Sequence, residues 1–258
     1  MATKIPISCW ARSLGDCRGK KSAEHIYSQA MFADGDTINV HGPPWTKGEP
    51  KLIGLSALTR KILCVSHNSL LSPLDTAGGK ITQAMRRCLQ RTHQCFSRKA
   101  SQFVPIRYSI DGKLFERWLL KTLINLCCGD PVYIGEHSAT LGMPDDKVVR
   151  ICFGLEDFSG KAGLYLTAHT GQTIRSELIV IPIPFVDQNN RIIGAGFNFL
   201  GYLFYLSLLE SELSEQFFDG VGYVGPQAIF TGTRPSWHPT NIEWKIGDRL
   251  CSKIHFNW

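Results

Sequence analysis

The sequence predicts an α+β protein in which a zinc-bound N-terminal module is followed by a mainly antiparallel β domain with one packed helix. Three observations support this prediction. Two spaced pairs of candidate zinc ligands occur between residues 9 and 67, and positive charge is concentrated in the first 104 residues. After Val104, short β-branched and aromatic runs alternate with turns. We therefore divide the chain into domains of residues 1–103 and 104–258.

The composition is that of a globular protein. Of the 258 residues, 43% are apolar and 19% are charged, which excludes a disordered or collagen-like chain. The first residues lack the apolar core of a secretory signal, so we expect a cytoplasmic protein. Its nine cysteines are then expected to be thiols or metal ligands rather than disulfides.

The charge is uneven along the chain. Residues 1–104 hold 15 Lys and Arg against 6 Asp and Glu, a net charge of +9, whereas residues 105–258 hold 13 and 16, a net charge of −3. A basic half suits a polyanion such as nucleic acid, although a solubilising surface is an equal alternative. The residues expected to contact phosphates are Lys20, Lys21, Arg60, Lys61, Arg86 and Arg87.

In the N-terminal part, strand and helix signals compete over residues 26–32, and the Gly- and Pro-rich residues 34–50 predict a loop. Residues 52–64 are apolar and lead into a compact turn over 64–68. A helix is predicted from Ser72 as N-cap, with Pro73 at its first position. Its apolar face is formed by Ile81, Ala84, Met85 and Leu89.

In the C-terminal part, strands are predicted over 104–110, 148–155, 163–170, 174–186, 192–209 and the end of the tail 237–258. Hairpin turns are predicted at Asp111-Gly112 and Asn189-Asn190, and a helix over 114–126. The uncharged run 192–209 is long enough to cross a bilayer, but its glycines favour buried strands, so no membrane partner is expected.

Four candidate zinc ligands come in two pairs, Cys9-x7-Cys17 and Cys64-x2-His67. Three thiols and an imidazole can close a tetrahedral Zn²⁺ site, which would connect two segments with few apolar residues. Two alternatives remain open. Some of these cysteines are simply buried thiols, or ligands come from Cys88, His93 and Cys95.

The order of these motifs carries a family resemblance. The Cys pair is followed by Glu24-His25-Ile26-x-Ser28 and then by Leu-Cys-x2-His-Asn-x3-Ser-x2-Asp over residues 63–75. This arrangement resembles the HNH family of ββα-metal endonucleases over residues 9–85. The resemblance implies a β-hairpin and a helix that hold one divalent cation, Mg²⁺ or Mn²⁺, beside the scissile phosphate. Zinc knuckles would brace the hairpin.

In that resemblance His25 matches the general base, since imidazole can accept a proton from water near neutral pH. Asn68 would orient His25 or touch the metal, and Glu24 and Asp75 would bind the catalytic cation. Each residue has a structural alternative. Glu24 could be a first-turn acid of a helix starting at Ser22, Asp75 part of a capping box, and Asn68 a turn residue.

The resemblance predicts a metal-dependent endonuclease that hydrolyses phosphodiester bonds, most simply in DNA. By analogy with the family, it would serve as a bacterial antiviral defence effector. The first alternative is a non-catalytic, zinc-stabilised nucleic-acid-binding protein. The second is an interaction protein whose β-rich half is functional and whose nuclease half is a relic. For residues 104–258 we expect substrate selection, self-association into a homo-oligomer or binding of a regulatory protein.

Overall fold

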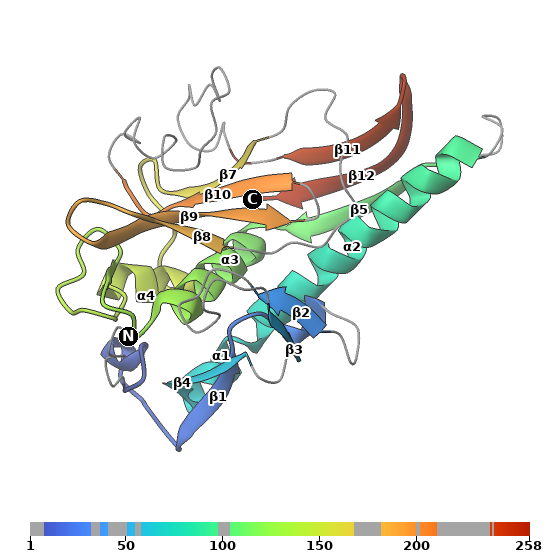
Figure 1. The fold of residues 1–258 in the computed structure, drawn as a ribbon. Coiled ribbons are helices and arrows are strands. Elements are labelled where there is room, and N and C mark those ends of the chain that lie inside the picture. Colours follow the sequence, from blue (N-terminus) through green and yellow to red (C-terminus); the bar gives the residue numbers. More distant parts are fainter. Residues whose placement is uncertain are drawn as a thin grey trace.

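The computed structural model describes residues 8–31, 37–40, 51–54, 58–97, 104–167, 182–199, 202–210, 238 and 240–258. The fold is α+β, as predicted, with helices packed against several small sheets (Figure 1). Helix α3 lies beneath the five-stranded sheet in this view, and α2 runs alongside the three-stranded sheet.

The first eight elements are η1 (Arg12–Leu14), β1 (Lys21–His25), η2 (Gln29–Met31), β2 (Thr37–Val40), β3 (Lys51–Gly54), β4 (Thr59–Cys64), α1 (Val65–Leu70) and α2 (Ser72–Ser97). Strand β1 pairs antiparallel with β4, and β2 pairs antiparallel with β3. The helix considered from Ser22 is wrong, because residues 21–25 form a strand. The loop predicted over 34–50 is wrong at residues 37–40, which form β2, and its other residues lie outside the described part of the chain.

The remaining elements are β5 (Ile106–Asp111), α3 (Gly112–Cys127), β6 (Tyr133–Ile134), α4 (Asp146–Cys152), β7 (Gly163–Thr167), β8 (Pro182–Val186), β9 (Arg191–Phe199), β10 (Tyr202–Ser207), β11 (Asn241–Ile246) and β12 (Arg249–Asn257). One sheet has the order β6-β9-β10-β7, with β8 also paired to β9, and another has the order β11-β12-β5. Pairing is antiparallel except for β6 with β9 and β12 with β5.

The run 192–209 is a hairpin of two buried strands, β9 and β10, as predicted from its glycines. In the part of the chain that the structure describes, no helix has the length and apolarity needed to span a bilayer. The predicted turn at Asn189-Asn190 is also confirmed, because Asn190 takes a positive φ of 61° between β8 and β9.

Two predictions in the C-terminal part are wrong for the same reason. Residues 148–155 were expected as a strand, but the Asp145 carboxylate accepts a hydrogen bond from Val148 N at 2.7 Å and caps helix α4. Asp111-Gly112 is not a hairpin turn, since Asp111 accepts a hydrogen bond from Leu114 N at 2.9 Å and caps α3. In both cases an N-cap outweighs the local β signal.

The hydrophobic core includes residues from both predicted domains. Met85 and Leu89 of α2 belong to the same buried cluster as Trp118 of α3 and Ile254 of β12. Helices α2 and α3 approach closely at Gly78, where a Cβ would lie 2.3 Å from Cε2 of Trp118. The division at 103/104 therefore does not separate two cores, and two domains stay a prediction.

Candidate functional site

Three cysteines and one histidine from four parts of the N-terminal region meet in one cluster. Cys9 and Cys17 flank η1, Cys64 is the last residue of β4, and His67 lies in the first turn of α1. Their ligand atoms all lie within 4.8 Å of one another. The turn at the end of β4 makes this local geometry, because Cys64 Sγ accepts a hydrogen bond from His67 N at 3.5 Å and caps α1.

The distances fit a tetrahedral metal ion such as zinc. His67 Nδ1 lies 3.3 Å from Cys9 Sγ, 3.6 Å from Cys17 Sγ and 3.3 Å from Cys64 Sγ. Zinc bonds of about 2.3 Å to sulfur and about 2.0 Å to nitrogen imply S···N separations of about 3.5 Å in a tetrahedral site. The predicted ligand set is therefore brought together by the fold.

The alternative ligands do not assemble. Cys88 and Cys95 are buried on α2, whereas His93 of the same helix is exposed. Among the described residues, these three side chains form no group that could hold a metal ion.

The protein environment shifts the pKa values of the cluster residues in different directions. Burial raises the pKa of the Cys9 thiol to about 12. Burial acts to raise the pKa of Cys64 too, but hydrogen bonds from the backbone of His67 and Arg18 lower it overall. Burial lowers the pKa of His67, which keeps its imidazole in the neutral form that ligates metals.

The cluster is connected to the C-terminal half through aromatic packing. The rings of His67 and Trp10 contact Phe153, just after α4, with centroids 5.5 and 5.7 Å away. Trp10 Nε1 donates a hydrogen bond to Asn125 Oδ1 of α3 at 3.3 Å. A metal ion at the cluster would thus stabilise contacts between the two halves.

The predicted ligands of the catalytic cation, Glu24 and Asp75, do come together, but around the ammonium group of Lys121. Lys121 Nζ lies 2.7 Å from Glu24 Oε1 and 2.9 and 2.8 Å from the two carboxylate oxygens of Asp75. Asn125 Nδ2 donates to Glu24 Oε1 at 3.2 Å. Three elements, β1, α2 and α3, meet in this cluster.

As folded, these residues do not fit a Mg²⁺ or Mn²⁺ ion. Such ions need several converging oxygen ligands, whereas the carboxylates here face N–H donors of Lys121 and Asn125. Burial acts to lower the pKa of Lys121, but Glu24 and Asp75 raise it overall, so the amine stays protonated. Burial raises the pKa of Glu24, and Lys121 opposes this shift.

Among the described residues, the side chains of the two proposed catalytic residues make no hydrogen bond to this cluster, although Asn125 Nδ2 donates to the backbone carbonyl oxygen of His25 at 3.3 Å. His25 pairs opposite Thr59 at the end of β1, where strand alternation directs its side chain away from the face of Glu24. Its imidazole is half-buried and makes no hydrogen bond to any described residue. Asn68 Nδ2 donates to Ser22 Oγ at 2.9 Å, which fastens α1 to β1. Their catalytic roles stay predictions.

The expected phosphate contacts divide into exposed and internal residues. Arg60 points inward, where its guanidinium donates to the carbonyl oxygens of Asn125, Leu126 and Cys128 at 2.5–3.2 Å and pairs with Asp130 at 3.1 Å. Arg60 therefore caps the C-terminal end of α3. Exposed residues are Lys20, Lys21, Lys61 and Arg87, and Arg86 is half-buried.

The sequence interpretation missed Lys121 and Asn125. Both lie on the apolar helix predicted over 114–126, four residues apart, and both are buried. A lysine on the face of a helix that is otherwise apolar was the available signal, since a buried charge needs a partner.

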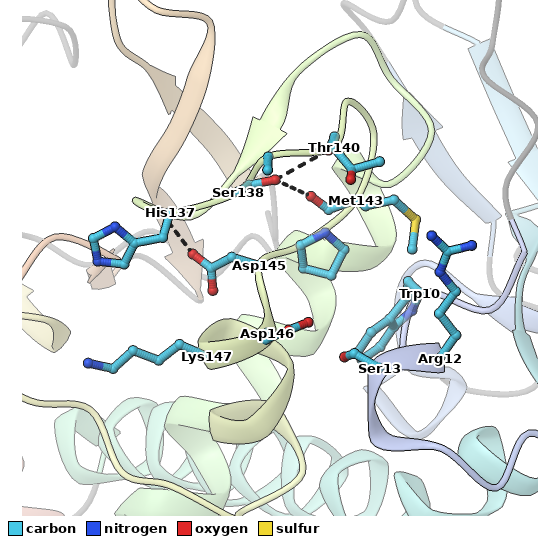
Figure 2. A pocket seen from close by; sticks show the side chains of 12 residues that line it. Trp10, Arg12, Ser13, His137, Ser138, Thr140, Met143, Asp145, Asp146 and Lys147 are labelled. Carbon is cyan, nitrogen blue, oxygen red and sulfur yellow. Dashed lines mark hydrogen bonds between the residues drawn. The ribbon is translucent and has the colours of Figure 1, made fainter.

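A cavity of about 390 Å³ lies between the η1 segment and residues 137–147 (Figure 2). Trp10, Arg12 and Ser13 line one side, and residues 137–140 and 143–147 line the other. Hydrogen bonds of its buried polar groups stabilise the loop that surrounds the cavity. Asp145 accepts from His137 N at 3.1 Å, and Ser138 Oγ donates to the carbonyl oxygens of Thr140 and Met143 at 3.2 and 2.9 Å.

Comparison with known protein families, curated proteins and solved structures finds no match. The HNH resemblance over residues 9–85 therefore stays a prediction that rests on its motifs.

We expect the purified chain to carry about one zinc ion, because the four ligands are already grouped. Cys64→Ser and His67→Ala should each reduce bound zinc to near zero and lower the melting temperature, as measured by elemental analysis and thermal denaturation. Cys127→Ala, at a buried thiol outside the cluster, is the matched control and should retain zinc. Equal zinc loss in all three variants would contradict the assignment.

Arg60→Ala should destabilise the fold by about 2–4 kcal/mol, because it leaves an acceptor-rich helix end and a carboxylate without their charged donor. Its exposed neighbour Lys61→Ala should change stability by less than about 0.5 kcal/mol. Urea denaturation of both variants measures the difference. Similar stabilities of the two variants would show that the internal role of Arg60 is wrong.

Proposed function

We propose that residues 8–97 form a zinc-stabilised module that binds nucleic acid through exposed lysines in and beside the β1/β4 strand pair. The observation that carries this proposal is that the Cys9–Cys17–Cys64–His67 cluster directly supports a strand pair with outward-facing lysines. In this proposal the ion is a structural Zn²⁺, since all four tetrahedral positions are taken by the protein.

The positions of the lysines support the proposal. Lys61 lies on β4 between Arg60, which points inward, and the buried Ile62, so its ammonium faces solvent. The carbonyl oxygen of Lys20 accepts from Val65 N at 3.1 Å, at the start of α1. A zinc ion bound by Cys64 and His67 would therefore hold the backbone of Lys20 in place.

The charge distribution is consistent with this surface. The net charge of +9 over residues 1–104 favours a polyanion, and lysine contacts to phosphates are independent of base sequence. We expect binding with little sequence preference. In this proposal nucleic-acid binding does not use Glu24, which is buried on β1.

Fluorescence anisotropy with labelled duplex DNA tests this surface. The wild-type protein should bind with an affinity that falls steeply with salt, and Lys20→Gln/Lys61→Gln should lower the salt slope by about 2. Lys245→Gln, on β11 at the opposite side of the molecule (Figure 1), is the control and should bind like the wild type. Binding that is unchanged in the double variant would reject the surface.

A second candidate function is endonuclease activity with His25 as general base. The observations in its favour are the half-exposed imidazole at the end of β1 and the order of elements, in which the paired strands β1 and β4 precede helices α1 and α2. This order is consistent with the ββα arrangement that the HNH resemblance implies. In this reaction His25 would accept the proton of an attacking water.

Nicking of supercoiled plasmid tests the second candidate. If it is correct, zinc-loaded wild-type protein nicks the plasmid when Mg²⁺ or Mn²⁺ is added, and His25→Ala loses at least about 100-fold in rate. His255→Ala, at an exposed histidine of β12, is the control. Omission of the added ion is preferred to a chelator, which would also remove zinc. Absence of nicking by the wild type would leave nucleic-acid binding alone.

A further inference from the structure

The contacts of Lys121 carry an inference that does not depend on nucleic-acid binding. We propose that the Lys121 ammonium is the resident cation of the Glu24–Asp75 site, so that the C-terminal half of the chain keeps this site closed to divalent ions. The site would otherwise present two carboxylates to an ion, as the HNH resemblance implies. The structure instead supplies an internal positive charge from α3.

The ammonium takes the central position of the cluster. Its nitrogen lies 2.7–2.9 Å from three oxygens that belong to two carboxylates, a set of strong, charge-assisted hydrogen bonds. A lysine ammonium has three donors. These contacts direct the ammonium to both carboxylates of the cluster.

Burial makes the ammonium hard to displace. The side chain of Lys121 is 3% exposed, and that of Glu24 is 5% exposed. Removal of the ammonium would leave the buried Glu24 carboxylate without its counter-charge, which is strongly unfavourable. Wild-type protein should therefore bind no divalent ion here at ordinary concentrations.

The negative charge of the site and its exposure to solvent indicate which kind of ion would bind there in place of the lysine ammonium. Glu24 and Asp75 together carry two negative charges, which a divalent ion neutralises. The side chain of Asp75 is 36% exposed, so a small ion has an entry from solvent once the lysine side chain is truncated. Carboxylate oxygens are the ligands that Mg²⁺ and Mn²⁺ prefer.

The test uses zinc-loaded full-length protein titrated with Mn²⁺ and followed by electron paramagnetic resonance and thermal denaturation. Lys121→Ala should lower the melting temperature by about 10 °C. It should gain one saturable Mn²⁺ site, and Mn²⁺ should restore part of the lost melting temperature. The wild type should show neither response. The control is Lys121→Ala/Glu24→Gln/Asp75→Asn, which lacks both carboxylates and should bind no Mn²⁺.

Two results would overturn the proposal. One is a Mn²⁺ titration of Lys121→Ala that matches that of the triple variant. The other is a Mn²⁺ site in otherwise wild-type protein that Asp75→Asn removes, because the lysine would then not exclude the ion. The second result begins with a titration of the wild-type protein, so it can be obtained even if Lys121→Ala does not fold. Lys121→Met, which keeps the apolar stem, is the alternative variant in that case.

Discussion

Two carboxylates of the N-terminal part, Glu24 and Asp75, find their counter-charge on a helix of the C-terminal half. The Lys121 ammonium that joins them is almost inaccessible to solvent. Because an unpaired buried charge is so unfavourable, β1 and α2 cannot leave α3 without a large loss of stability. Arg60 reinforces this arrangement from β4, since its guanidinium caps the C-terminal end of α3, close to Lys121 and Asn125. The β1/β4 sheet thus depends on α3 for its position.

The Cys9–Cys17–Cys64–His67 cluster stabilises the same strand pair from its other end. It connects the segment around η1 with the start of α1, and its aromatic neighbours pack against Phe153. A metal ion here and the lysine in the acidic cluster would act as two separate cations, one bound from solution and one built into the chain. At Glu24 and Asp75 the internal cation occupies the place that a divalent ion would need.

The sequence interpretation was most accurate where a few neighbouring residues carry the signal. The helix predicted from Ser72 forms α2, the apolar period over 114–126 forms most of α3, and the glycine-containing run 192–209 forms two strands. It was wrong at residues 148–155, because the hydrogen bond from Val148 N to Asp145 starts a helix within a β-branched run. An N-cap of this kind is a local signal for the start of a helix. The β-branched residues that follow it nevertheless favour a strand when the sequence is considered alone.

The sequence by itself determined the four members of the candidate metal cluster, since cysteine and histidine are few and their chemistry is specific. The HNH resemblance predicted that Glu24 and Asp75 bind one cation, and the fold brings both carboxylates to the Lys121 ammonium. Only the tertiary structure decided which cation that site holds. Lys121 is 46 residues from Asp75, and Asn125 is 101 residues from Glu24, so no periodicity or local spacing relates them. Their meeting depends on how α3 packs against β1 and α2, which is a property of the whole core.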